Sequence, residues 1–266
     1  MKVANKVVVV TGAGSGMGRE LALALLRKGA RVAAVDLNEA TLKETIALAG
    51  QSGDKISSHV ANVSDRQAVE ALPSAVIAAH GAVDGIINNA GIIQPFVRLN
   101  DLQYDAIERV INVNLYGVIY MSKAFLPYLL ARPAAHIVNI SSMGGFFPVP
   151  GQTVYGASKA GVKLLTEGLY AELLETNVRV TIVFPGAIAT NITQNSGVAI
   201  ERPTTDDAAQ SFPMTSAEDA AEMIIDGMER DRFQVYVGRD AKMMNLFYRF
   251  SPKRATQFMY SRMKEL

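Results

Sequence analysis

A tyrosine and a lysine four residues apart, Tyr155 and Lys159, are the residues whose types and spacing most directly suggest chemistry in this chain. They lie in a segment with a helical pattern, so both side chains emerge on one face. A free tyrosine titrates near pH ~10, but a nearby ammonium favours the phenolate. We therefore expect Tyr155 to donate and accept a proton, with Lys159 lowering its pKa. An isolated pair at this spacing is more often an exposed part of an ordinary helix, so other residues must support the prediction.

A serine stands thirteen residues before the tyrosine: Ser142, which directly follows an expected strand at residues 136–141. Ligands of doubly wound sheets bind at the carboxyl ends of strands, so its hydroxyl is placed to hold a substrate oxygen. A serine here can also form a turn or cap a helix. The adjacent Ser141 leaves the choice between the two hydroxyls open.

Two asparagines, Asn112 and Asn114, lie inside an expected helix at residues 101–130, where asparagine has poor propensity. One of them could face a buried water chain, although a solvent-facing asparagine is the commoner case. A further asparagine pair closes the fourth expected strand, in the run from Asn88 to Gly91.

The first expected strand runs into a glycine-rich turn, residues 11–18, which opens a helical pattern. Glycines at such a turn let the backbone approach a pyrophosphate, and the positive end of the helix favours the anion. The spacing fits T-G-x-x-x-G-x-G, and it departs from G-x-G-x-x-G because a methionine stands at position 17. A turn of this kind alone is weak evidence. The cofactor contacts expected from it come from Gly12, Ser15, Gly16, Met17 and Gly18.

An aspartate, Asp36, ends the second expected strand eighteen residues after Gly18, where a ribose-binding carboxylate belongs. An ionised carboxylate can accept from two ribose hydroxyls but repels a 2′-phosphate, so we expect NAD as the cofactor in preference to NADP. The next residue, Leu37, is not basic. Two alternatives weaken the preference: Asp36 could merely cap the next helix, and Arg19 could help to bind a phosphate.

The elements that must position these residues can be predicted from the hydrophobic pattern of the whole chain. Short apolar runs alternate with longer helical patterns, which predicts one Rossmann-type, doubly wound parallel α/β sheet of about seven strands with helices on both faces. The dinucleotide-binding and catalytic domain is expected at residues 1–238, with a substrate loop at about 189–215 and a helical extension at 239–266. The expected strands are 7–11, 31–36, 56–60, 83–88, 136–141, 178–184 and 233–237. The expected helices are 16–28, 39–50, 65–79, 101–130, 153–174 and 216–230.

Composition argues against several classes of protein. The chain has 266 residues, 49% of them hydrophobic and 19% charged, which suits one globular domain. It has no cysteine and three scattered histidines, so we expect no disulfides and no metal site. The formal charge of +1 gives no reason to expect nucleic acid. No apolar run is long enough to cross a bilayer, and we expect a cytoplasmic protein.

Taken together, these motifs resemble the short-chain dehydrogenase/reductase family, in order from residue 7 to about 190. Residues 11–18 resemble its glycine motif, Asn88 to Gly91 its N-N-A-G, and Ser142, Tyr155 and Lys159 its active-site set. Asn62 and Val63 resemble its adenine-contacting pair, with Asn in place of Asp. The remaining matches are the helix asparagine and the P-G-x-x-x-T segment that faces the nicotinamide: Asn114, Pro185, Gly186 and Thr190.

The resemblance implies a mechanism in which Tyr155 exchanges a proton with the substrate oxygen while a hydride passes between carbon and nicotinamide. Ser142 would hold that oxygen, Lys159 the nicotinamide ribose, and Asn114 a water that links Lys159 to solvent. The further expected cofactor contacts are Leu37, Asn89, Ala90, Gly91, Ile188 and Tyr155 itself. The expected substrate contacts are Gln94, Ser142, Met143, Gln152 and Tyr155, and their largely apolar surroundings suggest a secondary alcohol or ketone with a hydrophobic body. A homo-oligomer, dimer or tetramer, is also implied.

The chain departs from the simpler members of the family in its tail, because 28 residues follow Gly238. They include seven basic and two acidic residues, with apolar side chains before Pro252 and a second helical stripe after it. Packing on the domain or on a sister subunit is the ordinary role for such a tail. A basic amphipathic helix can also lie on an anionic membrane surface.

Three alternatives to an enzyme acting on free alcohols or ketones follow. The chain could be a non-catalytic nucleotide-binding module, although the presence of Asn114, Ser142, Tyr155 and Lys159 together argues against it. It could be a membrane-surface-associated reductase of lipid-like carbonyls, which only the tail supports. It could also be an isomerase or dehydratase on a related scaffold.

Overall fold

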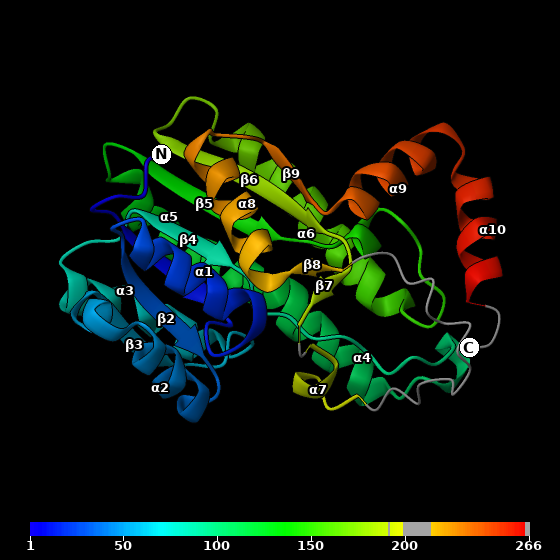
Figure 1. The fold of residues 1–266 in the computed structure, drawn as a ribbon, viewed down its shortest axis with the longest axis horizontal. Coiled ribbons are helices and arrows are strands. Elements are labelled where there is room, and N and C mark those ends of the chain that lie inside the picture. The colour runs from blue at the N-terminus through cyan, green and yellow to red at the C-terminus, as the bar shows by residue number, and fades with distance from the viewer. Residues whose placement is uncertain (191, 199–213, 264–266) are drawn as a thin grey trace.

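The computed structural model describes residues 1–190, 192–198 and 214–263. Seven parallel strands form one sheet in the order β3-β2-β1-β4-β5-β6-β9 (Figure 1). The chain reverses direction of winding between β1 and β4, as in a doubly wound sheet, so the predicted fold class is confirmed. The strands are β1 (Val7–Thr11), β2 (Arg31–Asp36), β3 (Ile56–Val60), β4 (Gly85–Asn88), β5 (Ala135–Ile140), β6 (Val178–Pro185) and β9 (Gln234–Val237).

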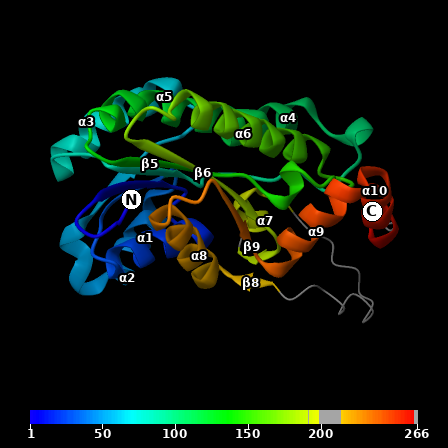
Figure 2. The same cartoon turned by 90° about the horizontal axis from the view of Figure 1, so that it is seen from above.

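Helices cover both faces of the sheet, because the strands are apolar on both sides. Figure 2 shows α3, α5 and α6 on one face and α1, α2 and α8 on the other. Val8 and Val10 of β1 pack under α1 and α8, whereas Val7 and Val9 belong to the core under α3 and α5. The helices are α1 (Gly16–Arg27), α2 (Glu39–Leu48), α3 (Arg66–His80), α4 (Tyr104–Ile111), α5 (Gly117–Leu130), α6 (Thr153–Glu172), α7 (Ile192–Asn195) and α8 (Ala217–Glu229).

The helix expected at residues 101–130 is interrupted. It consists of α4, a π-helical turn at Asn112–Tyr116 and α5, after a short 3-10 turn at Leu99–Asp101. The prediction of one continuous α-helix was therefore wrong. A π-turn inserts an extra residue per turn and occurs mostly at functional sites, and this one carries Asn114.

The tail forms two helices, α9 (Arg239–Phe250) and α10 (Pro252–Arg262), and Pro252 begins the second as expected. Met244 and Ala255 are buried against Phe147, so the tail packs on the chain segment that follows Ser142. None of the described helices has the length and apolar character needed to cross a bilayer.

The expected substrate loop at about 189–215 includes residue 191 and residues 199–213, which lie outside the described part of the chain. Within the described part, Ile188–Ala189 (β7) pairs in parallel with Thr215–Ser216 (β8), which joins the two ends of this segment. The expected division into residues 1–238 and 239–266 stays a prediction.

Candidate active site

A cavity of about 760 Å³ lies along the carboxyl edge of the sheet, where β1, β2, β4, β5 and β6 end. All eighteen positions expected to contact the cofactor line it, as do Ser142, Tyr155 and Lys159. Four expected site residues do not: Gln94, Asn114, Met143 and Gln152. Ser141 and three residues of the expected substrate loop, Ile192, Gln194 and Asn195, line it as well. The lining residues that were not foreseen are Asn38, Thr41, Ala61, Ile92, Ile93, Val113, Ile140 and Ala187.

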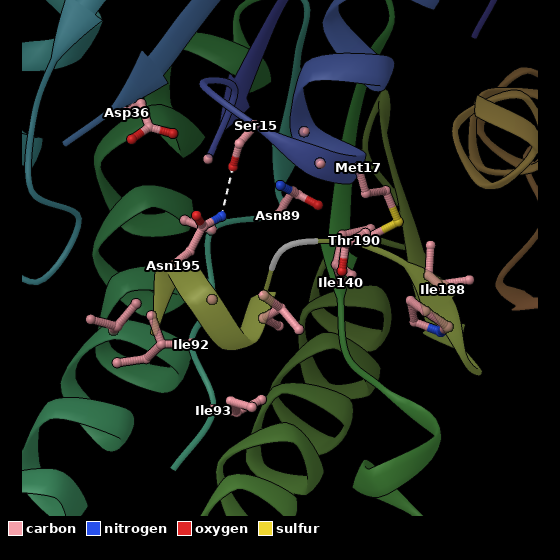
Figure 3. Close-up of a pocket in the computed structure, with 18 of the residues that line it drawn as sticks. Ser15, Met17, Asp36, Asn89, Ile92, Ile93, Ile140, Ile188, Thr190 and Asn195 are labelled. Atoms are coloured by element: carbon pink, nitrogen blue, oxygen red, sulfur yellow. Dashed lines mark hydrogen bonds between the residues drawn. The ribbon is translucent and has the colours of Figure 1, made fainter. Parts of the chain in front are cut away.

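The glycine turn brings the start of α1 to one part of this cavity (Figure 3). Gly12 has a φ of +68°, and a Cβ at Gly18 would collide with the carbonyl of Gly12. Ser15 is the N-cap of α1, and no side chain of the described residues caps its first turn. The free N–H groups of that turn are therefore available to an anion, as a bound pyrophosphate requires.

Asp36 is held at the edge of the same cavity by two backbone amides. Its carboxylate accepts from Gly14 N at 2.9 Å and from Asn38 N at 3.0 Å. Each carboxylate oxygen keeps a further lone pair, so two ribose hydroxyls can still donate to it. Asp36 does not cap the next helix. The N-cap of α2 is Asn38, whose side chain accepts from Ala40 N and Thr41 N.

The guanidinium of Arg19 is occupied by the protein itself. It donates to Thr45 Oγ1 at 3.1 Å and to the carbonyl of Gly14, and it pairs with Glu44 at 2.7 Å. A bound 2′-phosphate would have to compete with these partners.

The two adjacent serines at the end of β5 differ in what their hydroxyls do. Ser141 is buried, and its hydroxyl donates to the carbonyl of Lys159 at 2.7 Å. This hydrogen bond holds the loop that follows β5 against α6. Ser142 is partly exposed, and its oxygen accepts from Gly144 N at 3.0 Å. Since the Ser141 hydroxyl already donates to a backbone carbonyl and Ser142 is the less buried of the two, the geometry favours Ser142 for contact with a substrate oxygen.

Tyr155 and Lys159 project from the first turns of α6 into the cavity wall. A Cβ at Gly144 would lie 3.4 Å from the Tyr155 ring and 3.5 Å from Ser142 Oγ, so the phenol and the hydroxyl flank the same glycine. The Lys159 ammonium is buried and donates to the carbonyl of Ile140 at 3.0 Å. The three side chains thus meet at the carboxyl end of β5.

The electrostatics differ from the sequence-based prediction. Burial raises the pKa of Tyr155, and the nearby Ser142 hydroxyl lowers it by less. Burial also lowers the pKa of Lys159 to about 8. In this structure withdrawal from water therefore dominates, and the lowering of the Tyr155 pKa expected from Lys159 is not present. The phenol of the ligand-free protein accordingly keeps its proton.

Asn114 lies behind the cavity. Its side chain accepts from Ile92 N at 2.9 Å and donates to Ile92 O at 2.9 Å and to Ser158 Oγ at 3.1 Å. It therefore joins the chain after β4 to α6, one residue before Lys159. Asn112 is exposed, which resolves which of the two helix asparagines faces inward. The water that the family resemblance implies at Asn114 stays a prediction.

Gln94 and Gln152 are buried supports of α6 rather than cavity walls. Gln94 Oε1 accepts from Val154 N at 2.8 Å and from Tyr155 N at 3.0 Å, and its Nε2 donates to Gly151 O at 2.9 Å. Gln152 Nε2 donates back to Gln94 O at 2.8 Å. Both side chains are almost fully excluded from solvent, and their expected role as substrate contacts stays a prediction. An amide can cap a helix as well as bind a ligand, and the sequence did not distinguish the two.

Met143 is also absent from the lining of the cavity. It is half-buried and packs on the tail cluster, the apolar residues Phe147, Met244 and Ala255 that join the tail to the domain. Its expected role as a substrate contact stays a prediction.

A short helix, α7, lies across the cavity from the glycine turn. Asn195 Nδ2 donates to Ser15 Oγ at 2.8 Å, the dashed line of Figure 3. The next residue, Ser196, contacts the chain after β4, because its hydroxyl accepts from Ile93 N at 3.0 Å. The only sequence signal for this helix was its position after the P-G-x-x-x-T segment.

The donor set of the cavity fits a dinucleotide. Uncapped amides stand at the start of α1, a carboxylate stands beside them, and a buried ammonium with two hydroxyls stands at the far end. No group of three or more metal-ligating side chains occurs among residues 1–190, 192–198 and 214–263.

Comparisons with known proteins agree with this geometry. The family model for short chain dehydrogenases matches residues 6–200. The Mycobacterium tuberculosis protein SadH, which is named as an oxidoreductase, is 39% identical over 250 residues, which cover 92% of this chain and 90% of SadH. The 3-oxoacyl-[acyl-carrier-protein] reductase FabG of Thermotoga maritima is 38% identical over 196 residues, or 73% of this chain and 78% of FabG.

Among solved structures, a short chain dehydrogenase/reductase of Burkholderia phymatum in complex with NAD superposes with a TM-score of 0.81 and 29% identity. The match covers 89% of this chain and 90% of that one. The chain therefore belongs to the short-chain dehydrogenase/reductase family. It is an oxidoreductase of this family, whose members use NAD or NADP.

Proposed function

We propose that this protein is an NAD-preferring dehydrogenase/reductase that interconverts a secondary alcohol and a ketone with a hydrophobic body, with Tyr155 as the acid/base. One observation carries the proposal. Ser142, Tyr155 and Lys159 line the same cavity as the glycine turn and Asp36. A proton donor therefore stands at the far end of a site whose other end suits a dinucleotide.

The residues of this chain would handle the substrate oxygen and its proton. Bound NADH would supply the hydride. Ser142 would donate a hydrogen bond to the carbonyl oxygen, because its hydroxyl lines the cavity beside the Tyr155 phenol. Tyr155 would pass its proton to that oxygen as the alkoxide forms, and the reverse reaction would return it. Lys159 would bind the nicotinamide ribose and supply positive charge near the phenol.

Asp36 and Arg19 support the preference for NAD. The carboxylate has lone pairs left for two ribose hydroxyls, and Leu37 beside it is 66% exposed and uncharged. Arg19 is bound to Glu44 and to backbone carbonyls, so its guanidinium would have to give up these partners to offset the repulsion between Asp36 and the 2′-phosphate of NADP.

The apolar lining supports a substrate with a hydrophobic body. Ile92, Ile93, Ile140, Ile188 and Ile192 line the cavity. The similarity to FabG, named as a 3-oxoacyl-[acyl-carrier-protein] reductase, favours a ketone as the oxidised substrate.

We propose a homo-oligomer built on α5 and α6. An apolar groove runs between these helices, lined by Ile119, Leu126, Pro127, Leu130, Leu165 and Leu169, and Leu164 beside it is 70% exposed. A second copy of the chain would cover it. Sedimentation of the wild type and of Leu165→Asp tests this, and the same molar mass for both, whether monomer or oligomer, would contradict it.

A cytoplasmic location stays a prediction.

The test of the function is an assay of alcohols and ketones with NAD(H) and NADP(H), followed at the NADH absorbance band. We expect turnover with at least one hydrophobic secondary alcohol or ketone, more efficient with NAD(H). Tyr155→Phe should lower kcat by about a thousandfold or more, because the acid/base is lost. It should bind NADH as the wild type does, since the phenol oxygen mainly serves the substrate.

The same assay separates the alternatives. Binding of NADH without turnover of any substrate would favour the non-catalytic module. Conversion of a substrate without a change at the NADH band would favour an isomerase or dehydratase. Full activity of Tyr155→Phe would exclude Tyr155 as the acid/base.

A further inference from the structure

Helix α9 presents an outer face that is both basic and apolar. Its exposed residues recur at the spacing of one helical face: Arg239, Lys242, Met243, Leu246, Arg249 and Phe250. The apolar members protrude far into solvent, with 51% of Met243, 58% of Leu246 and 81% of Phe250 exposed. Cations and apolar side chains thus share one surface instead of occupying opposite faces.

Negative charge is missing from this face. Asp240 is the one acidic residue between positions 239 and 263, and it is buried on the opposite side of α9. Lys253, Arg254 and Arg262 add three exposed cations from α10. The outer surface of the tail is therefore strongly positive.

The inner face of α9 is fixed to the active-site edge of the sheet. Asp240 Oδ2 accepts from Ala187 N at 2.7 Å, next to the Pro185–Gly186 segment that lines the cavity. Met244 and Tyr248 pack on Phe147, with the two rings of Tyr248 and Phe147 edge to face at 6.1 Å. Figures 1 and 2 show α9 leaving β9 at its carboxyl end, with α10 at the outer end of the molecule.

Two kinds of partner could cover this face, and the charge distinguishes them. A second copy whose two-fold axis passed through this face would set cations opposite cations. An anionic lipid surface attracts the cations, and the apolar side chains between them can enter the boundary of headgroups and acyl chains.

We propose that the outer face of α9 docks on a bilayer that contains anionic lipids. The docked helix would hold the carboxyl edge of the sheet, with its cavity, beside the membrane. Hydrophobic alcohols and ketones partition into bilayers, so this placement would bring the enzyme to its substrates. The lipid binding itself does not depend on the proposed reaction and is tested without it.

The experiment is co-sedimentation of the full chain with vesicles of phosphatidylcholine that contain about a quarter phosphatidylglycerol, compared with phosphatidylcholine alone. We expect binding to the anionic vesicles only, weakened by salt. Lys242→Gln with Arg249→Gln should weaken partition about 25-fold, at about fivefold per cation. Leu246→Ser with Phe250→Ser should weaken it about tenfold or more, because two apolar side chains no longer enter the lipid.

Matched variants elsewhere on the surface control for a general loss of charge or apolarity. Lys43→Gln with Lys55→Gln removes two exposed cations, and Leu48→Ser with Tyr104→Ser removes exposed side chains of similar size. Both should sediment with the vesicles as the wild type does.

Equal losses in the matched and α9 variants would overturn the proposal, as would no binding to anionic vesicles. Light scattering on the same proteins tests the alternative that a second copy of the chain binds this face. If the α9 variants change the molar mass in solution while lipid binding stays the same, the face is a contact between subunits and the proposal is wrong.

Discussion

At the nucleotide end of the cavity, backbone amides hold the carboxylate that faces the ribose position, whereas at the catalytic end side-chain amides hold the segments that carry the acid/base. Asp36 is fixed by the amides of Gly14 and Asn38, and the start of α1 is left uncapped for a ligand. At the catalytic end, Gln94 holds the amide of Tyr155 and Asn114 joins Ile92 to Ser158.

The two ends should therefore respond differently to substitution. Changes at the nucleotide end remove contacts to the cofactor and should appear in KM and in cofactor choice. Changes at the catalytic end move the acid/base relative to the substrate and should appear in kcat, because geometry there limits proton transfer.

The largest expected effect concerns the buried ammonium at the catalytic end. Burial lowers the pKa of Lys159 to about 8, whereas an unfolded lysine keeps its proton up to about 10.5. Between these values the unfolded state binds more protons, so the free energy of unfolding should rise with pH. The rise in the cofactor-free protein, relative to Lys159→Met, should reach about 3 kcal/mol at most.

Chemical denaturation of both proteins at several pH values measures this difference. The comparison with Lys159→Met cancels other groups that titrate in the same range. Parallel curves for the two proteins would show that the lysine is not held in a desolvated site.

The second prediction tests the support of α6. Gln94→Leu removes the acceptor for the amides of Val154 and Tyr155, which should let the start of the helix shift and lower kcat by about a hundredfold. The KM for NADH should change little, because the nucleotide end is untouched. Gln94→Glu keeps an acceptor and should restore most of kcat.

Steady-state kinetics of the three proteins, with circular dichroism to confirm folding, measures this effect. A rise in the KM of the ketone with unchanged kcat would instead support the substrate contact that the sequence predicted for Gln94.

The same contrast explains how much the sequence could predict. The glycine turn and Asp36 are eighteen residues apart and joined by one helix, so a known motif and a strand end were enough to place them. The first three strands match the structure to the residue. The first two contain short, uninterrupted apolar runs, whereas the third, Ile56–Val60, has three polar residues between two apolar ends. Ser142, Tyr155 and Lys159 also lie on one cavity, since β5 leads directly to α6.

Other features depend on contacts that no local pattern records. Gln94 lies 60 residues from Val154, whose amide it caps, and polarity alone suggested a ligand contact. Met143, beside Ser142, packs on residues of the tail about 100 positions away in the sequence, a contact that no local pattern indicates. The pKa of Tyr155 follows from burial, which a spacing of four residues cannot show.

The third prediction concerns cofactor choice at the nucleotide end. Asp36→Ala should weaken NAD about tenfold or more, because two charge-assisted hydrogen bonds are lost, and should relieve the repulsion of NADP. The ratio of kcat/KM for the two cofactors, measured with one substrate, tests this. Asp65→Ala, which removes the cap of α3 instead, is the matched carboxylate control and should leave the ratio unchanged.

The smallest expected effect concerns the contact of α7 across the cavity. Asn195 and Ser15 share one exposed hydrogen bond, which is worth about 1 kcal/mol at most. Asn195→Ala should therefore raise the KM for NADH about threefold and leave kcat within about twofold, because the catalytic end keeps its own supports. Ser15→Ala should act in the same way, and the double variant should be no weaker than either single one if the two side chains act only through this bond. Additive effects would instead show that each residue contacts the cofactor separately.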